Sequence, residues 1–133
     1  MVVVRDWTRA WWNFQRSKYE IVSSDAVREE LEQGDQTNQK AKIALLQETR
    51  TLPLVPGVWE IVAVYLAHKL MPREVTGDAL HLALASFHKC DYLLTWNCQH
   101  LANANKFGHI RRINALVNLP TPELVTPLEL TAE

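Results

Sequence analysis

Carboxylate, amide and hydroxyl side chains occur in this sequence where apolar, strand-like runs end and helix-like segments begin. Asp78 opens the segment "TGDALHLALASFHK", while Thr95 and Asn97 follow the apolar run "DYLL". Glu30 lies in the helix-like segment after "IVSS", about 9 Å along that helix. Oxygen-rich sets of this kind suit hard divalent cations such as Mg²⁺ or Mn²⁺. The residue types therefore predict metal-assisted phosphate chemistry.

The elements that must position these side chains alternate along the chain between strand and helix. The segment "DWTRAWWNFQRSK" places Trp7, Trp11 and Phe14 on one helix face, whereas "YEIV", "TLPLVP", "DYLLT" and "PELVTP" have strand composition. The helices between these strands are too long for hairpin links, so the strands are expected to run parallel. We therefore predict an α/β fold of three layers, α/β/α, around a central parallel sheet of about four strands. Ligands of such sheets bind at the carboxyl ends of the strands.

Length and composition restrict the class of protein. The chain has 133 residues, which fits one domain spanning residues 1–133, and its formal net charge of -1 argues against nucleic-acid binding through a strong overall positive field. No run approaches the roughly 18 apolar residues of a membrane span, and the N-terminus lacks the apolar core of a signal peptide. We therefore expect a cytoplasmic protein without membrane association, whose Cys90 and Cys98 stay reduced.

Three stretches resemble the PIN-domain family, in particular the VapC-like proteins of bacterial toxin–antitoxin systems. They are "IVSSDAVREELEQGD", "TGDALHLALASFHKCDYLLTWNCQHLANA" and "IRRIN". The resemblance implies a metal-dependent ribonuclease in which acidic residues at strand ends hold Mg²⁺ or Mn²⁺. Glu30 matches the family's second acid and Asp78 its third. Thr95 and Asn97 match its Thr-x-Asp/Asn element, and His100 stands where an acid or a histidine is common.

By this resemblance the candidate residues divide into metal ligands, proton carriers and phosphate contacts. Asp78 would be the main metal ligand, Glu30 a ligand or general base, and Asn97 a further ligand. Thr95 and Asn97 would order the water shell or the scissile phosphate, and His100 would protonate the leaving oxygen. The RNA backbone would be met by basic side chains, namely Lys106, Arg111 and Arg112. An antitoxin protein is the second partner that the resemblance implies.

The chain departs from the family at its N-terminus. The family begins with a central strand that carries its first acid, and this chain is expected to begin at the family's first helix, with that strand missing. An alternative in which "MVVVRD" supplies the strand, with Asp6 at its end, is disfavoured because Asp6 leads directly into the helix face of Trp7. We therefore expect weak metal affinity.

A missing central strand would leave backbone groups of its two neighbours unpaired, which favours a homodimer in which another chain supplies cover. Adjacent Trp11 and Trp12 cannot both face one core, so one of them is predicted at such a contact.

Two other classes of function remain open. One is a catalytically impaired PIN-like protein that acts as a protein-binding or oligomeric module, in which Asp78 only caps its helix and Thr95 only closes its strand. The other is a structural domain with a zinc ion held by His88, Cys90, Cys98 and His100, although their spacing is not that of a zinc finger.

Overall fold

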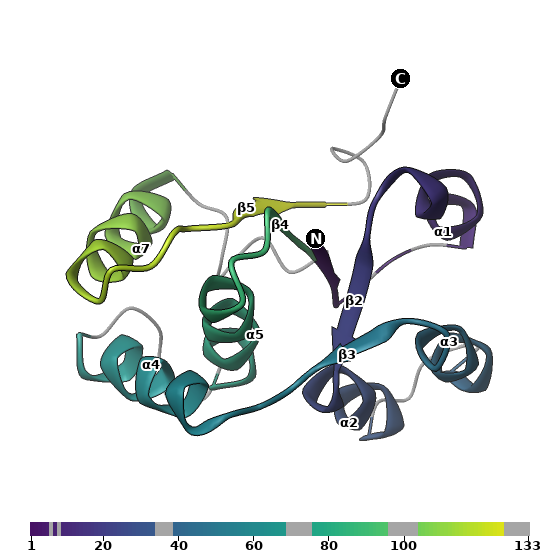
Figure 1. Cartoon of the computed structure of the whole chain (residues 1–133), viewed down its shortest axis with the longest axis horizontal. Coiled ribbons are helices and arrows are strands. Elements are labelled where there is room, and N and C mark those ends of the chain that lie inside the picture. The colour runs from purple at the N-terminus through teal and green to yellow at the C-terminus, as the bar shows by residue number, and fades with distance from the viewer. Residues whose placement is uncertain (6, 8, 34–38, 69–75, 96–103, 127–133) are drawn as a thin grey trace.

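Five short parallel strands pair into one sheet at the centre of the protein (Figure 1). The strands are β1 (Val2–Val4), β2 (Ile21–Ser24), β3 (Arg50–Leu52), β4 (Tyr92–Leu94) and β5 (Glu123–Val125), in the spatial order β3-β2-β1-β4-β5. The computed structural model describes residues 1–5, 7, 9–33, 39–68, 76–95 and 104–126, with the backbone alone at 9, 14–16, 39, 76–78 and 104–107. Val3 pairs with Val22 of β2 on one side and with Leu93 of β4 on the other.

Helices cover both faces of this sheet, which confirms the predicted three-layer α/β/α fold. They are α1 (Arg9–Gln15) with the 3-10 turn η1 (Arg16–Lys18), α2 (Asp25–Gln33), α3 (Gln39–Leu46), α4 (Pro56–Ala67), α5 (Thr76–Phe87) and α7 (Ala104–Leu116). Figure 1 shows α4, α5 and α7 together on one side of the sheet, and α1 and α3 on the other with α2 beside them. Every crossover between paired strands contains a helix, as parallel pairing requires.

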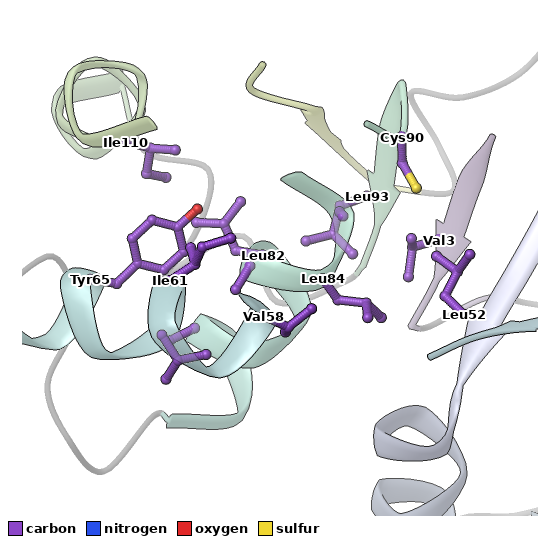
Figure 2. Packing of buried hydrophobic residues seen from close by; sticks show 14 of the residues in the cluster. Val3, Leu52, Val58, Ile61, Tyr65, Leu82, Leu84, Cys90, Leu93 and Ile110 are labelled. Carbon is purple, nitrogen blue, oxygen red and sulfur yellow. The ribbon is translucent and has the colours of Figure 1, made fainter. Parts of the chain in front are cut away.

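The core consists of two hydrophobic clusters, one on each face of the sheet. Successive strand residues point to opposite faces, so Val3 belongs to the cluster beneath α4, α5 and α7, while Val2 and Val4 belong to the cluster beneath α1, α2 and α3. Figure 2 shows the first cluster, in which Tyr65 and Ile61 of α4 face Ile110 of α7 and Leu82 of α5. Strands buried on both faces are typical of parallel sheets.

The expectation that the central strand is missing was wrong. Val2–Val4 form β1 at the centre of the sheet, and the following helix begins at Arg9 rather than at Asp6. Three successive β-branched side chains favour an extended backbone, and burial on both faces removes the alternating pattern that would have marked a strand. Since β1 pairs with both β2 and β4, no gap lies between them, and the homodimer prediction loses its physical reason. Asp6 lies outside the described residues.

The prediction that Trp11 or Trp12 marks an oligomer contact was also wrong, because both side chains are buried in the second cluster. Trp12 packs against Trp7, with ring centroids 5.5 Å apart, and Trp11 stacks on Tyr19 at 6.3 Å. Two adjacent helical residues share a core here because each packs on its own aromatic partner, one from before α1 in the chain and one from after it.

Candidate functional site

The beginnings of α2 and α5 lie at the carboxyl edge of the sheet. Helix α2 follows β2 without a break, and Ser24 caps it, since its Oγ accepts the Val27 N–H at 3.3 Å. Helix α5 ends shortly before β4 begins, so its first turn, which contains Asp78, lies at the same edge. The two helices pack against each other. The topology thus brings the helices of both predicted acids, Glu30 and Asp78, together.

The Glu30 carboxylate joins three elements of the fold. Its Oε1 accepts a hydrogen bond from Arg5 Nε at 3.0 Å, and its Oε2 accepts one from His81 Nε2 at 2.7 Å. Arg5 lies at the carboxyl end of β1, where its backbone N–H donates to the Leu94 carbonyl at 2.9 Å. His81 comes from α5. We call Arg5, Glu30 and His81 the Glu30 cluster.

The environment of Glu30 keeps its carboxyl group ionised. Burial raises the pKa, but hydrogen bonds and positive charge from His81 and Arg5 outweigh that effect and lower it from 4.5 to about 2. The Glu30 side chain is 42% exposed, whereas those of His81 and Arg5 are 1% and 10% exposed. The cluster therefore exposes an anionic carboxylate to solvent, and the donors that hold this carboxylate are largely buried.

One atom of this cluster is unsatisfied within the part of the chain that the structure describes. His81 Nδ1 is buried and has no hydrogen-bond partner there. A buried polar atom without a partner costs free energy, about 1 to 3 kcal/mol in typical proteins. Buried polar atoms without a partner are uncommon in folded proteins, so the presence of a histidine at this buried position needs a physical explanation.

A hollow of about 180 Å³ opens beside the cluster. Its described lining consists of Ala26, Glu29, Glu30, Gln33, Leu80 and His81. A larger hollow of about 290 Å³ lies at α4, α5 and the end of α7, and among its described lining residues Glu60 is the single ionisable side chain, the others being apolar. The smaller hollow is lined by three titratable side chains, Glu29, Glu30 and His81, so we take it as the candidate site.

The structure describes some of the other predicted site residues. Thr95 follows β4, is fully buried, and donates its N–H to the Val125 carbonyl at 2.9 Å, which favours the interpretation that it closes the strand. Arg111 and Arg112 are exposed on α7, a different helix from the two that carry Glu30 and Asp78. Asp78 and Lys106 are described in their backbone alone, and Asn97 and His100 lie outside the described residues.

Arg5 and His81 were not predicted from the sequence. His81 lies three residues after Asp78 in "DALHLA", so both share one face of α5, and this spacing was the available signal. No sequence signal marked Arg5, because it contacts Glu30 only as a result of the pairing of β1 with its neighbours in the sheet.

The described donors fit part of a metal site. Among the described side chains no three of His, Cys, Asp or Glu gather closely enough to hold an ion. Glu30 supplies an ionised, half-exposed carboxylate at a hollow, which is the kind of ligand that Mg²⁺ or Mn²⁺ takes, usually together with water and substrate oxygens. The donor chemistry is thus compatible with these ions.

The two described members of the predicted zinc set serve other purposes. His88 Nε2 lies 3.0 Å from the Pro53 carbonyl oxygen, and Cys90 is buried in the first core cluster, where burial raises its pKa to about 11. A thiol with a raised pKa is a poor source of the thiolate that zinc requires.

Comparison with protein-family models, with curated proteins and with solved structures gives no match. In the described ranges, every helix is too short or too polar to cross a membrane.

Proposed function

We propose that this protein is a metal-dependent endoribonuclease of the PIN type, a VapC-like toxin of a toxin–antitoxin system. The observation that carries the proposal is the ionised Glu30 carboxylate at the hollow between α2 and α5, at the carboxyl edge of a parallel sheet. Asp78 lies on the same face of α5 as His81, about 4.5 Å nearer to that edge along the helix axis. This is the position at which such sheets bind their ligands.

Glu30, Asp78 and Asn97 are the residues that would hold Mg²⁺ or Mn²⁺. The bound ion supplies a Lewis acid that activates water and offsets the charge on the phosphate. The Glu30 carboxyl group is already ionised at neutral pH, so it can bind a cation without first losing a proton. His100 would protonate the leaving oxygen. Arg111 and Arg112, exposed on α7, would contact phosphates of the RNA backbone, together with Lys106.

RNA cleavage tests the proposal directly. Single-stranded RNA is incubated with the protein and Mn²⁺, beside Asp78→Asn, Glu30→Gln and an EDTA control. We expect cleavage by the wild type and a loss of about 100-fold or more in both variants, because each removes an anionic ligand. Glu32→Gln is the matched control, since Glu32 is an exposed acid of the same helix. Cleavage that survives in Asp78→Asn and Glu30→Gln contradicts the proposal.

A second candidate function is a catalytically impaired PIN-like module that binds another protein, such as an antitoxin. The observation in its favour is that both oxygens of Glu30 are already hydrogen-bonded, one to Arg5 and one to His81. In this case the cluster only ties β1, α2 and α5 together. A folded wild-type protein that neither cleaves RNA nor binds Mn²⁺ supports this alternative.

A further inference from the structure

The His81 ring is held in a fixed orientation against Glu30. It is buried within α5, with 1% of its side chain exposed, and its Nε2–H donates to Glu30 Oε2 across 2.7 Å. Glu30 itself is 42% exposed, and an exposed glutamate without such a contact samples several rotamers. The buried ring therefore restricts the conformation of the exposed carboxylate.

The unpartnered Nδ1 indicates that packing alone does not account for a histidine at this position. Among the described residues, the other ring nitrogen, Nε2, has a single partner, Glu30. A leucine could fill a buried helix position without leaving a polar atom unsatisfied, and it would therefore avoid the cost of the orphaned Nδ1. The contact that histidine gains in return is the one to Glu30.

We infer that His81 is a positioning residue: its bond to Oε2 fixes the orientation in which the Glu30 carboxylate meets a metal ion. This inference rests on the proposed function, in which Glu30 helps to hold the metal ion. Arg5 Nε donates to Oε1 at 3.0 Å, so a metal ion at that oxygen would displace the Arg5 contact, whereas the bond from His81 to Oε2 would remain. Hydrogen-bonded groups behind a metal ligand orient it, and their loss typically weakens metal binding by about 10- to 100-fold.

The test compares Mn²⁺ affinities of two His81 variants by isothermal titration calorimetry. His81→Leu removes the donor, and we expect its Mn²⁺ affinity to fall by at least about tenfold. His81→Gln keeps an N–H near the position of Nε2, so its affinity should stay within about threefold of the wild type. His88→Gln is the matched control, because His88 follows α5 and lies near the Pro53 carbonyl instead. Circular dichroism establishes that each variant is folded.

The Mn²⁺ affinities of Glu30→Gln and of the wild type show whether an unexpected result contradicts this inference alone or also the proposed function. If Glu30→Gln weakens Mn²⁺ binding while His81→Leu binds as the wild type does, the positioning role is overturned and the proposed function stands. If the folded wild type binds no Mn²⁺ at all, both are overturned.

A measurement on the wild type covers the case in which His81→Leu does not fold. Mn²⁺ is paramagnetic, so an ion bound at Glu30 should broaden the NMR signals of the His81 ring, assigned with His81→Gln, more than those of His88. Equal broadening of the two rings overturns the inference.

Discussion

Two groups of polar side chains contact α5, and they differ in how completely they are satisfied. On one side, the Tyr65 hydroxyl donates to Asn114 Oδ1 at 2.6 Å, and Asn114 Nδ2 donates to Ser86 Oγ and Thr121 Oγ1, each at 3.1 Å. We call these four residues the Asn114 network. On the other side lies the Glu30 cluster, which carries charge, faces a hollow and contains an unpartnered nitrogen among the described residues.

The Asn114 network behaves as part of the core. Tyr65, Ser86 and Asn114 are fully buried, and Figure 2 shows the Tyr65 ring on α4 beside Ile110 of α7. Burial raises the pKa of Tyr65 to about 12, more than its hydrogen bonds to Ser86 and Asn114 lower it, so the hydroxyl remains a donor. A satisfied buried network fixes the relative positions of the elements that supply it, here α4, α5 and α7.

A polar group is a better candidate for function when it stays charged and partly exposed than when it is satisfied within the core. Polar groups that satisfy one another in the core need no ligand, whereas an ionised and partly exposed carboxylate on buried donors can still bind one. The same helix, α5, contributes Ser86 to the first arrangement and His81 to the second. Substitutions in the two groups should therefore differ in their effects on stability.

The largest effect on stability is expected for Asn114→Ala. This change removes a partner from Tyr65, Ser86 and Thr121 at once and leaves buried polar groups unsatisfied, at a cost of about 3 kcal/mol. Urea unfolding of the variant and the wild type measures it. Asn13→Ala on the exposed face of α1 is the matched control and should change stability by less than about 0.5 kcal/mol. Equal effects at Asn13 and Asn114 would show that the network does not stabilise the fold.

The sequence predicted most of this architecture, and the exception has a physical cause. The sequence indicated a helix directly after "IVSS", and the structure has α2 there, at Asp25–Gln33. Long helices between strands predicted the parallel sheet. The strand Val2–Val4 was missed because three buried valines show no alternation, and its central position depends on pairing with β2 and β4.

The candidate site was less predictable than the fold. The resemblance to PIN domains selected Glu30 and Asp78, and the topology brings their helices together. The partners of Glu30 could not be found in the same way, because Arg5 is 25 residues away in the chain and His81 is 51 away. A single histidine in an apolar helix is more often a satisfied core residue, so the three-residue spacing from Asp78 in "DALHLA" was too weak a signal to mark His81.

A smaller effect is expected for Arg5→Met, which breaks one contact of the Glu30 cluster. Glu30 keeps its bond to His81 and its access to water, so we expect a loss of about 1 to 2 kcal/mol, less than for Asn114→Ala. The matched control is Arg50→Met, because Arg50 lies 3.4 Å from Glu20 in a pair whose side chains are 60% and 61% exposed. Such pairs contribute about 0.5 kcal/mol or less. If Arg5→Met lowers the free energy of unfolding no more than Arg50→Met does, the Arg5 contact does not stabilise the fold as expected.

The smallest effect is the pH dependence that Glu30 contributes. Its pKa is lowered from 4.5 to about 2 in the folded protein, so its stabilising contribution is present above about pH 4.5 and is lost as the pH falls towards 2. The stability difference between the wild type and Glu30→Gln should therefore shrink between pH 5 and pH 3. Solvent screening of a side chain that is 42% exposed limits the change to less than about 1 kcal/mol.

Urea unfolding at several pH values measures this difference, and Tyr65→Phe provides the contrast from the other group. Because the pKa of Tyr65 is about 12, the phenol stays protonated throughout the acidic range, and the stability difference caused by Tyr65→Phe should not depend on pH there. A constant difference for both variants would mean that Glu30 titrates as it does in the unfolded chain. The Glu30 cluster would then lack the electrostatic character that sets it apart from the Asn114 network.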